Sequence, residues 1–505
     1  MSKEKHLRTR VTSNASSLHL ATPAYVAAFY LIGMLTMLFS LSMLPPIAVA
    51  LYFQDGGVYP FLATFILTFI GGGLCWLPFR SVQLELRKRD GFLVVVGFWL
   101  LISLLGALPF NFANNPHLPY VDAVFESVSG LTTTGATVMS GLDNLPHSIL
   151  YYRSQLNFLG GMGIVVLAVA LLPMLGIGGM QLYVAETPGP MKNDKLTPRV
   201  TETAKRLWMI YAGITLLCVL SFWAAGMSLF DAINHAFATM ALGGFSTHDA
   251  NIGFFESNRI EWVAGIFSFI AGINFALHFT AWRSRSIREY LRDQEFLLYC
   301  AVMVVIVLVT WLMLFSQGSF TGMRTFSHAF FQSLSVATDN GLVTTGYPAE
   351  WPAFIPVFLV LASFFGGCAG STCGGIKAIR FLLLYKISVQ ELKYLIHPNA
   401  VIATRIGNRT IEPRVMTAVL GFYFLYIFSY CLFSLLVMAT GVDVVTAFGS
   451  VAGTLNNMGI GLGETSSNFG VLSDTATWLL SLSMLVGRLE VFPLLLLIHP
   501  DFWRR

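Results

Sequence analysis

Long apolar runs separated by short polar segments dominate the chain. Ten of them approach or exceed the roughly 20 residues that a helix needs to cross a bilayer. They lie near 24–53, 59–79, 92–110, 148–176, 207–226, 260–282, 296–316, 352–365 with 376–385, 415–440 and 475–498. We therefore predict ten membrane segments, of which the eighth is interrupted.

Four shorter and less apolar segments lie between spans, near 121–134, 231–243, 326–340 and 443–458. Each begins with Asp or Ser, which are favoured N-cap residues, at Asp122, Asp231, Ser327 and Asp443. Each continues for about three helical turns and reaches a glycine, at Gly135, Gly244, Gly341 and Gly459. Segments this short cannot cross as helices, so we interpret them as re-entrant.

The spacing between these glycines is 109, 97 and 118 residues, which indicates four copies of one unit. The predicted fold is an all-α polytopic membrane protein with four tandem span–pore-helix–span repeats in a pseudo-fourfold arrangement around a central pore. We assign residues 92–200, 201–295, 296–410 and 411–505 to the repeats, and residues 1–91 to an N-terminal two-span extension.

Composition supports the membrane assignment. Hydrophobic residues make up 55% of the chain and charged residues 11%, with a mean hydropathy of +0.69. A soluble domain has about 25% charged residues, so a soluble enzyme and a disordered chain are both excluded. The net charge of +4 gives no indication of nucleic-acid binding. The six cysteines lie in or beside apolar segments, which disfavours a disulfide framework. Cys368 and Cys373 are close enough for a metal pair, but no histidine cluster accompanies them, so buried free thiols are favoured.

Positive charge is distributed asymmetrically. If the N-terminus is cytoplasmic and the spans alternate, 26 of the 30 Lys and Arg residues fall on cytoplasmic pieces. The remaining four are Arg153, Arg259, Arg324 and Arg488. This orientation puts the re-entrant segments on the outer side and both termini in the cytoplasm.

A glycine after a short buried helix allows a backbone whose carbonyl groups point toward a central axis. Four such segments would form a ring of carbonyl oxygens that replaces the hydration shell of a cation, aided by the negative ends of the short helices. Within the short strings that end at the four glycines, Asp339 is the one carboxylate, which favours a monovalent ion over a divalent one. The alternative is that the glycines serve only close helix packing.

The four motifs resemble the filter motifs of the Trk/Ktr/HKT superfamily of potassium transporters. They read Thr-Thr-Thr-Gly135, Gly-Gly244-Phe-Ser-Thr, Thr-Asp-Asn-Gly341 and Leu-Asn-Asn-Met-Gly459. The two additional N-terminal spans make the chain similar to TrkH/TrkG-type membrane subunits. Because all four filter positions are glycine, the resemblance implies potassium as the ion.

By position, the potassium-binding filter residues are predicted to be Thr133, Thr134, Gly135, Leu242, Gly243, Gly244, Asp339, Asn340, Gly341, Asn456, Asn457 and Gly459. The mixture of side chains favours backbone carbonyls as ligands, since Leu242 cannot bind a cation through its side chain. In the fourth segment we align Gly453 with Gly130, which makes Met458 an inserted residue.

A glycine-rich sequence interrupts the third repeat between residues 366 and 375, near mid-membrane. A helix is poorly maintained by so many glycines, and the resemblance implies an intramembrane gating loop here. The candidate gate residues are Gly366, Gly367, Gly370, Ser371, Thr372, Gly374, Gly375, Lys377 and Arg488. An intramembrane arginine such as Arg488 is costly and indicates function, although a structural ion pair is the alternative. Glu490 is not an obvious partner for it, whereas Arg153 and Glu126 could pair.

The resemblance also implies a homodimer in the bacterial inner membrane, with a cytosolic nucleotide-binding regulatory subunit of the TrkA type. We expect potassium as the only ligand of this chain, with NAD or ATP on the partner, because Gly459–Gly463 lacks the βαβ context of a nucleotide loop. The basic cytoplasmic loops could also contact anionic membrane lipids.

Two other classes are disfavoured. A membrane enzyme would need a catalytic cluster, yet the ten histidines are scattered. A carrier built from inverted repeats would not orient all four units alike. A sodium- or proton-coupled cation symporter of the same fold remains the alternative to a channel-like pore.

Overall fold

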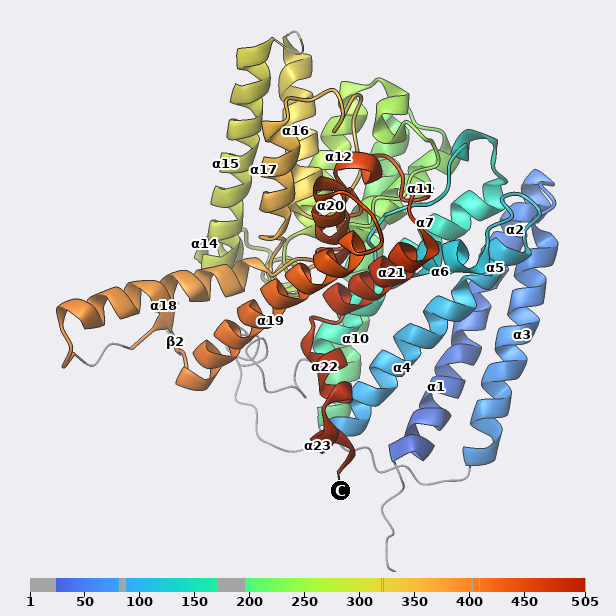
Figure 1. Cartoon of the computed structure of the whole chain (residues 1–505), viewed down its shortest axis with the longest axis horizontal. Coiled ribbons are helices and arrows are strands. Elements are labelled where there is room, and N and C mark those ends of the chain that lie inside the picture. The colour runs from blue at the N-terminus through green and yellow to red at the C-terminus, as the bar shows by residue number, and fades with distance from the viewer. Residues whose placement is uncertain are drawn as a thin grey trace, which may run out of the picture.

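The computed structural model describes residues 24–80, 88–170, 196–318, 320, 322–400, 403–407 and 409–504. Parts of the predicted cytoplasmic pieces, and the end of the predicted span 148–176, lie outside these residues. The described chain is almost entirely helical (Figure 1). Its strands are β1 (Arg405–Ile406) and β2 (Arg409–Thr410), which pair antiparallel.

The N-terminal extension is a helical hairpin. It consists of α1 (Ala24–Ser40), α2 (Leu44–Phe53) and α3 (Val58–Trp76). A Cβ on Gly33 would lie 2.8 Å from the Gly72 carbonyl oxygen, and one on Gly72 would lie 2.8 Å from that of Gly33. The two glycines therefore allow α1 and α3 to approach more closely than larger residues would.

The remaining helices alternate between long and short elements. They are α4 (Lys88–Gly106), α5 (Leu108–Phe112), α6 (Tyr120–Leu131), α7 (His147–Ala170), α10 (Leu196–Ala225), α11 (Leu229–Ala241), α12 (Asn258–Ala271), α13 (Phe275–Ser284), α14 (Arg288–Arg292), α15 (Gln294–Gln317), α16 (Met323–Ala337), α17 (Phe354–Ser363), α18 (Ala378–Ile396), α19 (Pro413–Met438), α20 (Val444–Leu455), α21 (Asp474–Arg488), α22 (Phe492–Ile498) and α23 (Pro500–Trp503).

Within the described residues, six helical segments are long and apolar enough to cross a membrane, so the protein is a multi-pass membrane protein. The predicted interruption of the eighth span is confirmed, because α17 ends at Ser363 and α18 begins at Ala378.

Two spans predicted as continuous are instead sharply bent. The predicted span 260–282 consists of α12 and α13 at 91°, and the predicted span 475–498 consists of α21 and α22 at 111°. At the first bend the Asn274 side chain caps α13 by accepting a hydrogen bond from Ala276 N. At the second bend Glu490 and Val491 have positive φ angles, and Pro493 cannot donate a helical hydrogen bond.

The four predicted short helices are present as α6, α11, α16 and α20, and their residues are largely buried. Their predicted N-caps are mostly wrong, because only Asp443 caps its helix, by accepting from Val445 N and Thr446 N. The other three helices begin earlier, after Pro119, Ser228 and Gly322. Asp122 and Asp231 instead lie in the first turn, where a carboxylate also stabilises a helix.

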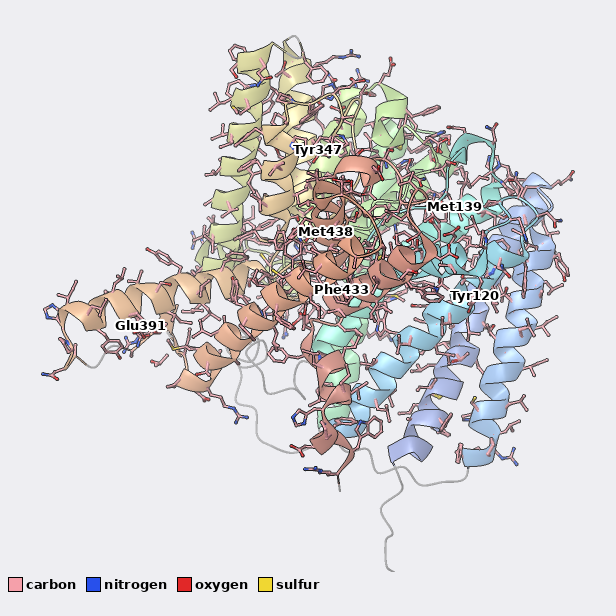
Figure 2. All side chains as sticks on the ribbon, viewed as in Figure 1. Tyr120, Met139, Tyr347, Glu391, Phe433 and Met438 are labelled. Atoms are coloured by element: carbon pink, nitrogen blue, oxygen red, sulfur yellow. The ribbon has the colours of Figure 1, made fainter. Side chains whose placement is uncertain are left out.

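An arm made of α18 and α19 leaves the bundle (Figure 1). Ile379, Leu383 and Val415 are buried in the small cluster that joins the two helices. Side chains stand out around the far part of α18, where Glu391 lies (Figure 2). The six cysteines are free, and Cys368 and Cys373 are buried as predicted, whereas Cys431 is exposed.

Candidate ion filter and intramembrane loop

All four short helices end in the same backbone motif. Two residues before each motif glycine, a non-glycine residue has a positive φ: Thr133 (52°), Leu242 (55°), Asp339 (62°) and Asn457 (57°). The motif glycines follow with φ of 81°, 66°, 76° and 84°. Left-handed conformations are uncommon for residues with a side chain, and they cluster at functional sites.

The hydrogen bonds of these four ends also match. The amide directly before each glycine donates to the carbonyl five residues earlier, as in a Schellman motif. The four bonds are Thr134 N to Ser129 O, Gly243 N to Ala238 O, Asn340 N to Ser335 O and Met458 N to Gly453 O.

This pattern corrects the predicted register of the fourth segment. Gly453 occupies the position of Ser129, so it does not align with Gly130, and Met458 is not an insertion. Met458 stands where Thr134, Gly243 and Asn340 stand in the other copies. Sequence reasoning missed Met458 because the alignment was anchored on a helix glycine rather than on the residues that end the helix.

The four glycines are arranged in a closed cyclic order. A Cβ added to any one of them would overlap the carbonyl oxygen that precedes the next glycine. These distances are 2.4 Å from Gly135 to Gly243 O, 2.5 Å from Gly244 to Asn340 O, 2.2 Å from Gly341 to Met458 O and 2.2 Å from Gly459 to Thr134 O. The structure thus brings the twelve predicted filter residues, together with Met458, to one place.

A second repeated feature lies nine residues before each glycine. The residues there are Glu126, His235, Gln332 and Ser450, and all four are fully buried. Each bonds the chain after its own glycine: Glu126 Oε2 accepts from Val138 N (3.1 Å), His235 Nε2 lies 2.9 Å from Ser246 Oγ, Gln332 Oε1 accepts from Thr344 N (3.0 Å), and Ser450 Oγ lies 2.8 Å from Thr465 Oγ1. In the sequence, the only signal for this set is its constant distance from the glycines. Sequence reasoning missed it because the four residue types are all different.

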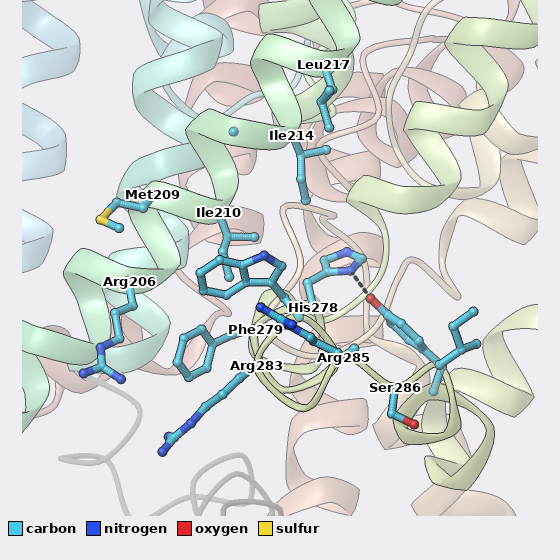
Figure 3. Close-up of a pocket in the computed structure, with 15 residues that line it drawn as sticks. Arg206, Met209, Ile210, Ile214, Leu217, His278, Phe279, Arg283, Arg285 and Ser286 are labelled. Carbon is cyan, nitrogen blue, oxygen red and sulfur yellow. Dashed lines mark hydrogen bonds between the residues drawn. The ribbon is translucent and has the colours of Figure 1, made fainter.

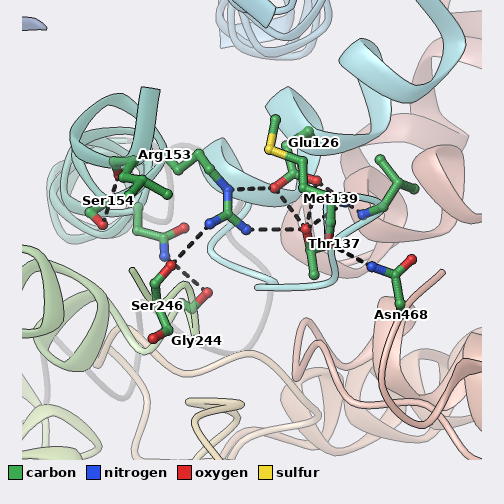
Figure 4. A network of polar contacts seen from close by, with 12 residues as sticks. Glu126, Thr137, Met139, Arg153, Ser154, Gly244, Ser246 and Asn468 are labelled. Carbon is green, nitrogen blue, oxygen red and sulfur yellow. Dashed lines mark hydrogen bonds and ion pairs between the residues drawn. The ribbon is translucent and has the colours of Figure 1, made fainter. Parts of the chain in front are cut away.

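The predicted pair of Arg153 and Glu126 is confirmed, with Arg153 Nε 2.7 Å from Glu126 Oε1. Arg153 is 1% exposed and also donates to Thr137 Oγ1 (3.1 Å) and to the Ser246 carbonyl (3.0 Å). Figure 4 shows this network joining the chain after Gly135 to the chain after Gly244. A buried arginine with several acceptors fixes its neighbours in one geometry.

The third segment is held in a similar way by Glu261 of α12. Its carboxylate accepts from Thr344 Oγ1 (2.6 Å) and Ser327 Oγ (2.7 Å), and it lies 2.7 Å from His328 Nδ1. Buried hydrogen-bonded networks of this kind make the arrangement of the four segments rigid.

A cavity of about 690 Å³ lies above the ring, and all four motif glycines line it. His248 lies at its rim, where Nδ1 is 2.5 Å from Asp143 Oδ1 and Nε2 is 3.5 Å from Asp231 Oδ1. Burial alone would lower the pKa of His248, but the bonds to the two carboxylates outweigh it and raise that pKa above its ordinary value of 6.5.

The interrupted span forms a loop on the other side of the ring, and all the predicted loop residues lie in it. It contacts the ends of the short helices through its backbone and a side chain: Gly375 N donates to Asn456 O (3.1 Å), and the Thr372 hydroxyl donates to Met240 O (3.1 Å). A Cβ on Gly374 would lie 1.8 Å from Asn456 O, so this contact requires glycine. The loop is therefore packed directly against the ring.

Arg488 contacts this loop from the last long helix. Its Nη1 donates to the Thr372 carbonyl (3.0 Å), while Nε and Nη2 find no hydrogen-bond partner among the described residues. Arg488 is the last residue of α21, directly before the 111° bend, and not within a continuous span as predicted. Lys377 is 7% exposed and bonds the Cys373 carbonyl within the loop.

Glu490 does not pair with Arg488, but for a reason other than the predicted one. Glu490 lies in the break after α21, so helical spacing does not apply to it. Its carboxylate pairs with Arg380 of α18, whose guanidinium carbon lies 3.9 Å from the Phe422 ring centroid.

Asp339 is the filter residue whose environment differs most from the others. Its side chain is fully buried, and neither carboxylate oxygen has a hydrogen-bond partner among the described residues. Its Oδ2 would lie 3.4 Å from a Cβ on Gly366, so the carboxylate faces the loop. Lys377 and Arg488 are the positive side chains whose charges act on it.

Long apolar helices, together with short buried helices that meet end to end in a polar ring, define an integral membrane transport protein rather than an enzyme. Comparison with known families gives the more specific result. Residues 59–504 match the profile described as "TrkH: Cation transport protein". The chain belongs to the TrkH family of cation transport proteins.

The most similar proteins include Trk system potassium uptake proteins TrkH of Vibrio parahaemolyticus and of Escherichia coli. Each is 50% identical to this chain and covers 94% of it and 98% of the relative. TrkG of Escherichia coli is 45% identical over the same shares. The crystal structure of the potassium transporter TrkH from Vibrio parahaemolyticus is similar with a TM-score of 0.89 and 47% identity, covering 95% of this chain and all of that one.

Proposed function

We propose that this chain takes up potassium across the bacterial inner membrane through a channel-like pore, which is formed by four tandem repeats around a pseudo-fourfold axis. The closed cyclic order of the four glycines and the carbonyl groups before them carries this proposal. The relatives' names as potassium uptake proteins support the choice of ion. The repeats correspond to residues 92–200, 201–295, 296–410 and 411–505, after the extension 1–91.

The ring would select the ion through backbone oxygens. Its four segments share backbone torsions and hydrogen bonds while their side chains differ, which indicates that the backbone carries the common function. The C-terminal ends of the four short helices meet at the ring, and their dipoles place partial negative charge there. A site with partial charges and few fixed carboxylates suits a monovalent cation. In the fourth segment, the carbonyl groups of Asn457 and Met458 take the role first assigned to Asn456 and Asn457.

The loop and Arg488 would gate the pore. The loop contacts the ring from the side opposite the outer cavity, and Arg488 brings an incompletely bonded guanidinium to it. A positive charge beneath a cation filter is an electrostatic barrier, and the glycines of the loop give its backbone the freedom to change conformation.

We further propose that the chain forms a homodimer and is regulated by a cytosolic nucleotide-binding subunit of the TrkA type. The relatives' designation as parts of a Trk system supports a multi-component transporter. Both termini would be cytoplasmic, and C-terminal helix α23 lies at the end of the molecule where α1 begins (Figure 1).

Flux into proteoliposomes tests the proposal. Purified wild type and Gly135→Ser are compared in potassium and in sodium, with a cytosolic fraction added in a parallel arm. We expect potassium flux that loses selectivity over sodium in the variant, since the added side chain meets Gly243 O. The absence of cation flux in both arms would overturn the proposal, whereas flux that requires a proton or sodium gradient would identify the coupled symporter.

A further inference from the structure

A second cavity lies away from the ring, between α10, α13 and α14, with a volume of about 950 Å³ (Figure 3). One part of its wall is apolar and comes from successive turns of α10, at Met209, Ile210, Ile214 and Leu217. Leu217 is 58% exposed and Trp282, on the opposite wall, is 71% exposed. An apolar cavity that opens this way on a membrane protein is accessible to lipid chains.

The charged side chains of the lining are arginines. Arg206, Arg283 and Arg285 line the cavity, and none of the described residues that line it carries a carboxylate. Figure 3 shows Arg206 and Arg283 pointing to the same end, away from Ile214 and Leu217. The cavity therefore has an apolar part and a cationic mouth, as an anionic amphiphile requires.

Local structure holds this mouth in place. The 91° bend after α12 turns α13 aside, so that if α12 follows the bilayer normal, α13 lies near the membrane plane. Helix α13 ends at Ser284, and Arg285 takes a left-handed conformation (φ 51°) that lets Ser286 N donate back to Ala281 O. Because α13 ends here, Arg283 in its last turn and Arg285 just after it both lie at the mouth of the cavity.

A buried histidine fixes the wall opposite α10. His278 Nε2 lies 3.0 Å from the Ile270 carbonyl, which can only accept, so Nε2 carries the proton. Nδ1 lies 2.8 Å from the Tyr290 hydroxyl, which then donates to it in the neutral tautomer. These two bonds tie α12, α13 and α14 together and preform the cavity.

We propose that this cavity binds one anionic phospholipid of the cytoplasmic leaflet. Its phosphate lies between Arg206, Arg283 and Arg285, and an acyl chain lies along α10. Basic pockets between membrane helices on the cytoplasmic side are suited to such headgroups. Charge complementarity selects an anionic lipid over a zwitterionic one, and the apolar wall selects a lipid over free phosphate.

Native mass spectrometry of the detergent-solubilised protein tests this. Binding of phosphatidylglycerol is compared with that of phosphatidylcholine and of inorganic phosphate. The double variant Arg283→Gln with Arg285→Gln removes two of the three positive charges at the mouth of the cavity. Arg288→Gln is the control, because Arg288 is exposed one turn further on and does not line the cavity. We expect at least about fivefold weaker phosphatidylglycerol binding in the double variant and none of this loss in the control.

A cavity-filling variant tests the apolar part separately. Gly213 lines the cavity, and a Cβ placed on it would have no atom within 4 Å, so Gly213→Leu fits without overlap. We expect it to weaken phosphatidylglycerol binding while size-exclusion and melting behaviour stay like the wild type. Equal binding of both lipids, equal loss in Arg288→Gln, unchanged binding in Gly213→Leu, or phosphate binding as tight as lipid would each overturn the proposal.

Discussion

The two faces of the ring are built differently. On the outer face, the chain after each glycine is bonded to the buried residue nine positions before it. Arg153 joins the first segment to the second, and Glu261 bonds the third segment to α12. On the inner face, a loop with several glycines covers the ring, and buried polar atoms of Arg488 and Asp339 find no partner among the described residues.

This difference separates two tasks. Discrimination between ions of similar size depends on closely set distances, and a network built around the buried Arg153–Glu126 pair helps to fix them. Opening needs a part whose movement costs little, and unpartnered buried polar groups raise the free energy of the closed arrangement. We infer that the outer face selects and the inner face gates.

The largest expected effect comes from the ring itself. Gly459→Ala would place a Cβ 2.2 Å from Thr134 O at a backbone with φ of 84°. Strain of about 1–3 kcal/mol at such a site predicts a fall in potassium flux of about tenfold or more. Gly421→Ala is the control, because Gly421 lies in α19 with open space around it. Potassium flux that fell equally in the two variants would contradict the role of the ring.

Glu126→Gln tests the rigidity of the outer face. It leaves the Arg153 charge buried without its carboxylate, which costs about 3–5 kcal/mol of stability. Thermal unfolding in detergent would check this, with Glu464→Gln as the control, since Glu464 is exposed. A melting temperature that is unchanged in Glu126→Gln would show that the outer network does not hold the ring.

Arg488→Ala tests the inner face. Removal of the charge and of the bond to Thr372 O should raise basal potassium flux several-fold, since the electrostatic barrier is lost. The ratio of potassium to sodium flux should stay constant. Arg414→Gln serves as the control, because Arg414 is exposed near the start of α19. Basal flux that did not rise would remove Arg488 from the gate.

The smallest effect concerns the rim of the outer cavity. Because the pKa of His248 is raised, its charged bonds to Asp143 and Asp231 stabilise the rim fully below its ordinary value of 6.5. This contribution is lost as pH rises above 6.5 and passes through the raised pKa. Melting temperature followed against pH should show this decline in the wild type and not in His248→Gln. His499→Gln, at the other end of the chain, should keep the wild-type profile.

The sequence was sufficient to predict the parts that repeat. The four short helices, the glycines at their ends and the Glu126–Arg153 pair follow from apolar length, backbone freedom and the cost of a buried charge. The bends after Ala271 and Arg488 were missed because their flanking sequence is as apolar as a continuous span. The bridge from Arg380 to Glu490 was also missed, because 110 residues separate its partners.

The predicted alignment of the fourth segment with the other three was wrong for a local reason. Gly453 resembles Gly130 in sequence, but helix ends are determined by which amide bonds which carbonyl, and that pattern is not visible in residue types. Met458 carries no polar side chain that would have indicated a role for its carbonyl.

One measurement tests the division between the two faces most directly. Reversal potentials and flux magnitudes are recorded in the same bilayers for wild type, Gly459→Ala and Arg488→Ala, with potassium and sodium on opposite sides. The account predicts a shifted reversal potential only in Gly459→Ala and an increased flux at unchanged reversal potential in Arg488→Ala. A reversal potential that shifts in Arg488→Ala and stays constant in Gly459→Ala would contradict it.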